Sequence, residues 1–127
     1  MKAKAVLNWY AKDPAMLSGL REFFIPPASL RHFATIRLGT KWAQGLDHHD
    51  IVAVSISDDP KKPNVIGFAE IKLVLEVKIK DLKLSDLERN IGAKTHVDVV
   101  RDMRKVYGKK KVDGNSVVTL LWLLPIQ

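Results

Sequence analysis

The amino-acid sequence contains no cysteine and no long hydrophobic run. Without cysteine the chain cannot form disulfides or use a cysteine nucleophile, which fits a protein of the reducing cytoplasm. No segment approaches the roughly 18 consecutive apolar residues that a membrane-spanning helix needs, so we expect no membrane partner. The chain also lacks a Walker-type phosphate loop, a dinucleotide-binding glycine loop and a Gly-x-Ser-x-Gly elbow. These absences exclude most common classes of nucleotide-hydrolysing enzymes and esterases.

Acidic residues are in the minority, with 14 Asp and Glu against 21 Lys and Arg. The net charge of +7 and the sequence pI near 9.7 give the protein a positive field, which raises its rate of encounter with phosphates and other polyanions. We therefore expect RNA or a nucleotide as partner. The 127 residues form one domain by the usual length relationship, and 46% hydrophobic content suffices for a core without metal or disulfides.

Turn residues and apolar periodicity predict the element order β, α, β, β, β, α, α, β. Strands are expected at Ala3 to Tyr10, Ala34 to Leu38, Ile51 to Ser57, Val65 to Lys80 and Val117 to Leu124. Helices are expected from Asp13 to about Arg21, from Ser85 to about Gly92 and from Thr95 to Gly108, each opened by a capping residue. The central strands follow one another without crossover helices, which disfavours a parallel βαβ fold. The fold class is therefore α+β, a small mixed, partly closed barrel with flanking short helices.

The clearest strand signal is the period-two alternation in the second half of the segment Val65 to Lys80. It predicts that Ile71, Leu73, Leu75, Val77 and Ile79 face one way. Val74 is the one apolar residue on the opposite, charged side. Trp9 and Trp122 lie in apolar strands, so we expect them in the core.

Three short motifs occur in a fixed order along the chain. The run Arg31-His32-Phe33-Ala34-Thr35-Ile36-Arg37 precedes a strand that starts after Asp50. A Gly67-Phe68-Ala69-Glu70-Ile71 strand follows, and Tyr107 stands at the end of the last predicted helix. In order and spacing the chain resembles the ASCH family, small β-barrel domains related to the PUA RNA-binding fold.

The resemblance covers the chain from about Leu30 to its end. Thr35 and Arg37 fall on the last two positions of the family pattern Gly-x-Lys-x-x-Thr-x-Arg. The sequence departs from the family at three positions. Leu30 stands where the pattern has Gly, His32 where it has Lys, and His49 where it has the Gly of a Gly-Asp pair.

The resemblance implies a PUA-like barrel with a cleft beside the first motif and an RNA-directed role. Some members of the family hydrolyse the amide of N4-acetylcytidine with a Lys, a Thr and a Glu. Such activity here would need Thr35 as nucleophile and His32 as its base, with Glu88 the nearest candidate for the Glu. In an extended strand His32 and Thr35 lie roughly 10 Å apart, so their contact needs a bend.

The leading hypothesis is RNA or nucleotide binding at this cleft. Thr35 and Arg37 share one face of a strand and can address the same ligand, and Arg31 flanks them. Arginine offers a planar set of donors suited to phosphate. Lys41 and Trp42 lie in a predicted loop, residues 39–45, where a cation beside an indole suits an unpaired nucleotide. Trp42 has an equally strong alternative, packing against the core.

The last predicted helix carries basic residues away from its apolar stripe, and a lysine loop follows it. The candidates for phosphate-backbone contact are Arg101, Arg104, Lys105, Lys109, Lys110 and Lys111. A solvated helix face is the ordinary alternative.

The run Asp47-His48-His49-Asp50 suggests a metal site at first sight. Adjacent strand residues point to opposite faces, and no second cluster completes a coordination shell, so the run predicts a turn. We expect no metal and no cofactor. Three functions remain open: an RNA- or nucleotide-binding module, an amidohydrolase of an acylated pyrimidine nucleoside, and a protein-interaction module whose basic surface meets an acidic partner.

Overall fold

The computed structural model describes residues 2–10, 18, 21–22, 31–57, 59, 61–108 and 111–126. The helix expected from Asp13 to about Arg21 falls almost entirely outside these residues. So do Lys109 and Lys110.

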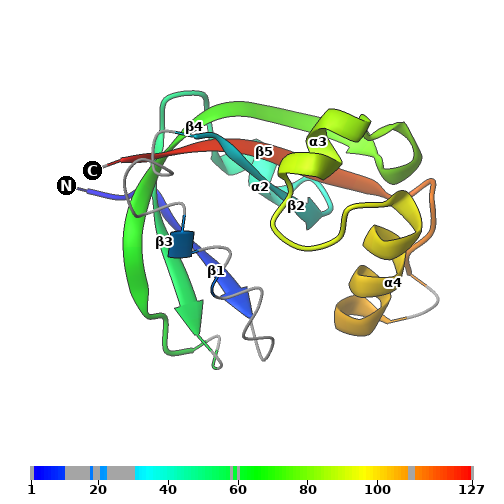
Figure 1. Cartoon of the computed structure of the whole chain (residues 1–127), viewed down its shortest axis with the longest axis horizontal. Coiled ribbons are helices and arrows are strands. Elements are labelled where there is room, and N and C mark those ends of the chain that lie inside the picture. Colours follow the sequence, from blue (N-terminus) through cyan, green and yellow to red (C-terminus); the bar gives the residue numbers. More distant parts are fainter. Residues whose placement is uncertain are drawn as a thin grey trace.

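Five strands form one curled sheet that closes into a half-barrel (Figure 1). They are β1 (Ala5–Tyr10), β2 (Phe33–Leu38), β3 (Ile51–Ser57), β4 (Val65–Lys78) and β5 (Val117–Ile126). Their order in the sheet is β1-β3-β4-β5-β2. The β1–β3 pair is parallel and the other pairs are antiparallel. The expected α+β fold class with a partly closed, mixed barrel is confirmed.

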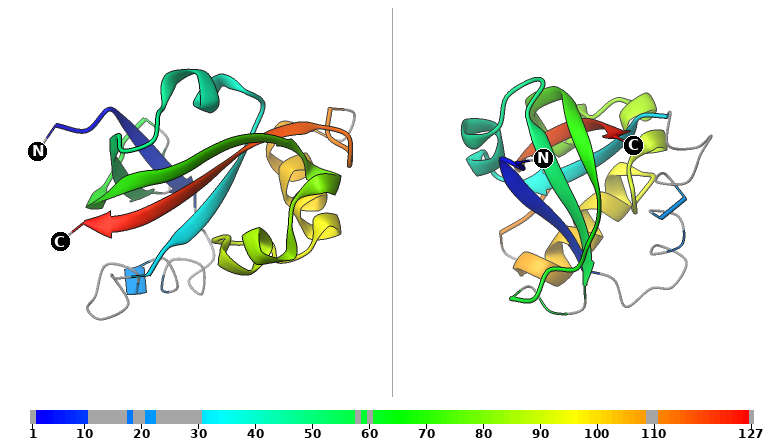
Figure 2. Two further views of the ribbon diagram at one scale, coloured as in Figure 1. Left: turned by 90° about the horizontal axis from the view of Figure 1, so that it is seen from above. Right: turned by 90° about the vertical axis from the view of Figure 1, so that its left-hand side faces the viewer.

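Among the described residues, the α-helices α2 (Lys41–Gly45), α3 (Leu84–Arg89) and α4 (His96–Tyr107) lie outside the sheet. Figure 2 shows that α3 and α4 gather at one end of the long β4–β5 pair. A 3-10 turn, η2 (Ile79–Asp81), follows β4. None of the helices described is long and apolar enough to cross a membrane.

Two of these helices differ from their sequence-based predictions. Residues 39–45 were expected as a loop, but five of them form α2, where the Gln44 amide nitrogen donates to the Thr40 carbonyl oxygen at 3.1 Å. Helix α3 begins before Ser85, because Asp86 accepts a hydrogen bond from the Lys83 backbone nitrogen at 3.2 Å and so closes the first turn. The capping role predicted for Thr95 is confirmed, since its Oγ1 accepts from the Asp98 nitrogen at 3.1 Å.

A β-bulge contradicts the single face predicted for the second half of β4. The register against β5 shifts between Ile71 and Leu73, which reverses the direction of the side chains that follow. Ile71 and Val74 therefore pack in the barrel interior. Leu73 and Leu75 are 42% and 43% exposed. Val74, the apparent exception in the sequence pattern, is apolar because the bulge turns it inward.

The two faces of the sheet bury two separate cores, and β5 contributes to both. Leu121 and Leu123 point into the barrel, where they join Leu7, Trp9 and Phe33. The alternate residues of β5 face the helices. That second core contains Val118, Leu120, Leu87, Val99 and Met103, with Trp122 packed against it. Because strand residues alternate between the faces, β2 likewise presents one set of side chains to the barrel and the other to the helices.

The run from Asp47 to Asp50 forms a turn before β3, as predicted. The Asp47 nitrogen donates to Asp50 Oδ2 at 2.8 Å, and the Asp50 nitrogen donates to the Asp47 carbonyl oxygen at 3.1 Å. Within this turn His49 has a φ of 75°. That is the left-handed region, which glycine enters at far lower cost than histidine.

Candidate functional site

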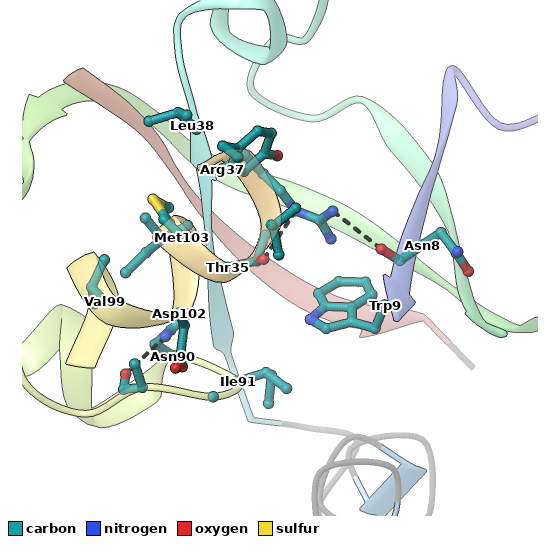
Figure 3. A pocket seen from close by; sticks show the side chains of 15 residues that line it. Asn8, Trp9, Thr35, Arg37, Leu38, Asn90, Ile91, Val99, Asp102 and Met103 are labelled. Atoms are coloured by element: carbon teal, nitrogen blue, oxygen red, sulfur yellow. Dashed lines mark hydrogen bonds between the residues drawn. The ribbon is translucent and has the colours of Figure 1, made fainter. Parts of the chain in front are cut away.

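A pocket of about 280 Å³ lies beside the open edges of the half-barrel, where β1 and β2 approach each other (Figure 3). Asn8 and Trp9 line it from the end of β1, and residues 35–38 line it from β2. Residues 90–93 and one side of α4 complete the wall. The pocket therefore combines four segments that are distant in the sequence.

Alternation along β2 turns Thr35 and Arg37 toward this pocket. Phe33, two residues earlier on the same side, is fully buried in the barrel core, and its ring centroid lies 6.1 Å from that of Trp9. Thr35 is 3% exposed. Arg37 is half-buried. The strand thus places an apolar residue at depth, a hydroxyl above it and a guanidinium nearest the opening.

The guanidinium of Arg37 is held from several directions (Figure 3). Its Nε donates to Thr35 Oγ1 at 3.3 Å and its Nη1 donates to the Asn8 carbonyl oxygen at 3.1 Å. The Arg37 Cζ lies 4.7 Å from the Trp9 ring centroid and 5.8 Å from the Trp42 ring centroid. Both distances are within cation–π range.

Arg37 makes no ion pair with a carboxylate in the part of the chain that the structure describes. Burial lowers the pKa of Arg37 to about 10, and Tyr107 opposes that change. The side chain is therefore charged at neutral pH. A half-buried cation with aromatic and neutral polar neighbours is suited to receive a negatively charged or strongly polar ligand atom.

The loop of residues 90–94, which lies beside β2, is held in place by hydrogen bonds. The Ile91 nitrogen donates to the Ala34 carbonyl oxygen at 3.0 Å, and Asn90 Nδ2 donates to the Ala93 carbonyl oxygen at 2.9 Å. Lys94 Nζ donates to the carbonyl oxygen of Asn90 and, at 3.0 Å, to that of Glu88. This wall of the pocket is consequently preformed.

Helix α4 supplies a mostly apolar wall. Val99, Met103 and Val106 line the pocket together with the carboxylate of Asp102. Tyr107, at the helix end, is 46% exposed and offers an accessible aromatic ring. Apolar and aromatic walls with a few convergent polar groups are typical of small-molecule sites, whose volumes start at about 300 Å³. The volume here suits one small group.

The structure does not bring His32 and Thr35 together. His32 is exposed, and its ring centroid lies 6.4 Å from that of Trp122, which packs against the core beneath the helices. It does not line the pocket, and strand alternation directs it away from the face that Thr35 shares. Glu88 is also exposed and does not line the pocket. The backbone is already extended strand from Phe33 through Thr35, so no bend in that stretch turns Thr35 back toward His32.

The other residues predicted around the cleft lie outside the pocket. Arg31 and Lys41 are exposed. Trp42 is half-buried and packs against the barrel core while its ring stays within reach of Arg37. Trp42 therefore helps to position Arg37. Of the two roles predicted for Trp42, packing against the core is the one that the structure supports.

The basic residues of α4 lie on the side of the helix away from the pocket. Arg101 pairs with Asp98 at 3.1 Å and with Asp102 at 3.6 Å. Arg104 Nε donates to the Val112 carbonyl oxygen at 2.9 Å, a hydrogen bond that joins the helix to the segment that follows it. Lys105 and Lys111 are exposed. The cleft and the basic helix surface are thus two separate features.

Sequence reasoning missed the pocket residues Asn8 and Asn90 and gave Trp9 only a core role. Trp9 is 4% exposed, as expected of a core residue, yet it also borders the pocket. Its neighbour Asn8 contributes a backbone oxygen, which carries no signal in the sequence. Asn90 lines the pocket because α3 packs against β2 and so brings the loop that follows α3 to this wall, which no local sequence pattern indicates.

Comparison with known proteins supports the architecture. No protein-family model matches the chain, and no curated protein matches its sequence. The crystal structure of an ASCH domain from Lactobacillus crispatus JV V101 is similar, with a TM-score of 0.60 and 12% sequence identity. The similarity covers 97% of this chain and 80% of that one. At this identity the likeness concerns the fold. The chain has the PUA-like fold of an ASCH domain.

Proposed function

We propose that this domain binds single-stranded RNA or a nucleotide, with one base held in the pocket between β1, β2 and α4. The observation that carries the proposal is Arg37, a half-buried cation at the pocket with no carboxylate partner among the described residues. Burying an unpaired charge is costly, and a phosphate or base carbonyl oxygen offsets that cost. The ASCH and PUA-like fold and the net charge of +7 favour a nucleic-acid ligand in general.

The pocket supports a definite placement of such a ligand. Tyr107 provides a stacking surface for the base, and Trp9 provides an apolar border. Arg37 and the Thr35 hydroxyl contact the polar edge of the base or its phosphate. A base must leave its helical stack to enter a pocket, so single-stranded RNA or a free nucleotide is the preferred form. Arg31 and Lys41 contact neighbouring phosphates from outside the pocket.

Hydrolysis of an acylated pyrimidine nucleoside is less well supported, because the described pocket residues place no general base beside Thr35. Among the described residues that line the pocket, Asp102 is the one carboxylate, and its Oδ1 lies 3.6 Å from Arg101. No lysine or histidine lines the described wall. The Thr35 oxygen accepts a hydrogen bond from Arg37, which helps to position a ligand but removes no proton from the hydroxyl.

The test is binding of a fluorescent single-stranded RNA, and of free nucleotides, at roughly 50 and 200 mM salt. Arg37→Met removes the charge, and Arg89→Met is the matched control, since Arg89 is exposed on α3 and does not line the pocket. We expect Arg37→Met to weaken binding at least about tenfold and the control to change it less than about twofold. Equal binding by the two variants would refute the proposal.

A parallel assay separates binding from hydrolysis. Thr35→Val keeps the shape of the side chain and removes its hydroxyl. We expect Thr35→Val to weaken nucleotide binding by several-fold and the unaltered protein to leave N4-acetylcytidine intact. Turnover of N4-acetylcytidine that disappears in Thr35→Val would instead establish the hydrolase.

A further inference from the structure

A second groove, of about 800 Å³, lies on the other side of α4 from the pocket. One wall is formed by Ile79 and Lys80 of η2 together with Gly114. The opposite wall is the side of α4 that runs from His96 to Lys105. The two cavities share no lining residue, so a ligand in one leaves the other accessible.

The groove has apolar residues along its length. Ile79 is fully buried beneath it, Val100 is half-buried, and Val97 is 76% exposed at the start of α4. A β-branched aliphatic residue that is largely exposed within a groove is available for contact with another molecule.

The walls of the groove are positively charged. Lys80, Arg101, Arg104 and Lys105 line it, and no carboxylate does so among the described residues. Arg101 shares its charge with Asp98 and Asp102 on the helix, and Arg104 is bonded to the Val112 carbonyl oxygen. Lys80 and Lys105 make no ion pair within the described part of the chain. Two lysines that make no ion pair with any described residue thus stand on opposite walls.

We propose that this groove docks an acidic amphipathic helix of a partner protein. Apolar side chains of that helix lie on Val97 and Val100, and its carboxylates pair with Lys80 and Lys105. The twelve residues of α4 span roughly 18 Å, so the matching segment has about three helical turns.

An RNA strand fits this groove less well. Phosphates could pair with the lysines, but they would leave the apolar residues without a partner. Proteins that hold unpaired bases use aromatic side chains as stacking surfaces, and no Trp, Tyr or Phe lines the described groove. Charge complementarity together with the apolar residues therefore favours an acidic helix. This inference does not depend on the pocket around Arg37.

The experiment uses the full chain and a fluorescent synthetic helix of about 14 residues, with leucine on one face and glutamate on the others. The test variants are Val97→Asp and the double variant Lys80→Glu/Lys105→Glu. The double variant Lys61→Glu/Lys62→Glu is the matched control. It changes the net charge equally at exposed positions away from the groove. A peptide of the same composition, scrambled so that its leucines share no face, tests the apolar contact.

We expect both test variants to weaken binding of the amphipathic peptide at least about tenfold, and the control to weaken it less than about threefold. The scrambled peptide should bind about tenfold more weakly than the amphipathic one. Equal binding of the two peptides, or equal losses in the test and control charge variants, would overturn the proposal. So would a loss of single-stranded RNA binding in Lys80→Glu/Lys105→Glu without loss of peptide binding, which would assign the groove to nucleic acid.

Discussion

Arg37 donates a hydrogen bond to the backbone oxygen of Asn8, 3.1 Å away, although 29 positions separate the two residues in the sequence. Asn8 lies on β1 and Arg37 on β2, the two outer strands of the sheet. No strand ladder joins β1 to β2, so this bond links the two edges across the opening of the half-barrel. The same side chain lines the pocket. Arg37 therefore takes part both in the link between the two sheet edges and in the proposed binding site.

Replacing Arg37 by methionine is expected to lower the free energy of unfolding by about 1–2 kcal/mol, because the Asn8 oxygen and the Thr35 hydroxyl each lose a donor. Urea unfolding of ligand-free protein measures this, with Arg89→Met as the control at about zero. Arg37→Lys should bind the ligand more tightly than Arg37→Met and less tightly than the unaltered protein, since lysine keeps the charge but loses the planar arrangement of donors. Unchanged stability in Arg37→Met would mean that the link contributes nothing to barrel closure.

The pKa of the Glu70 carboxyl lies below its usual value because of its hydrogen bonds with Lys72 and then with His49. The unfolded chain then binds a proton more readily than the folded one. The stabilisation is complete above the ordinary pKa of about 4.3 and is lost as the pH falls through the lowered folded-state pKa.

We expect Glu70→Gln to be less stable than the unaltered protein at pH 7, and the difference to shrink as the solution is acidified below about pH 4.3. Urea unfolding across this pH range measures it. Glu76→Gln is the control on the same strand, since Glu76 is exposed and makes no ion pair among the described residues. A Glu70→Gln effect that stays constant with pH would contradict the role assigned to this carboxylate.

The sequence predicted the order of the main elements because its turn residues and apolar periods agree with each other. The end of β1 at Tyr10 and the start of α4 after Thr95 were predicted correctly, since a run of β-formers and a capping box are local signals. The bulge in β4 could not be predicted this way, because it arises from the register against β5, a partner distant in the chain. The apolar Val74 on the otherwise charged side of the strand was the one sign of this bulge in the sequence.

The candidate site was half predictable for a similar reason. Thr35 and Arg37 share a strand face, so their pairing follows from the two-residue period. Asn8 and Trp9 enter the pocket because the sheet curls until its edges meet, which no local pattern encodes. Arg101, Arg104 and Lys105 were predicted as candidates for phosphate-backbone contact, and the structure places them across α4 from the pocket.

His49 adopts a φ of 75° at the position where the ASCH pattern has glycine. A side chain in this region costs stability relative to glycine because its Cβ crowds the following carbonyl oxygen. We expect His49→Gly to be more stable than His49→Ala by about 0.5–1 kcal/mol, after allowance for the greater freedom of glycine in the unfolded chain. The alanine variant removes the imidazole in the same way, so the comparison isolates the backbone. Equal stabilities in urea would show that the turn relaxes around residue 49.

Asp86 is 8% exposed and accepts hydrogen bonds from Trp122 Nε1 at 2.9 Å and from the Lys83 nitrogen at 3.2 Å. Asp86→Ala leaves both donors unsatisfied, so we expect a loss of about 2 kcal/mol in the free energy of unfolding. Asp86→Asn, which keeps an acceptor oxygen, should lose less. Ser85→Ala is the informative control, because the sequence predicted Ser85 as the helix cap whereas the structure starts α3 before it. Ser85→Ala should change stability by less than about 0.5 kcal/mol. A loss of about 1 kcal/mol in Ser85→Ala would restore the sequence-based assignment of the cap.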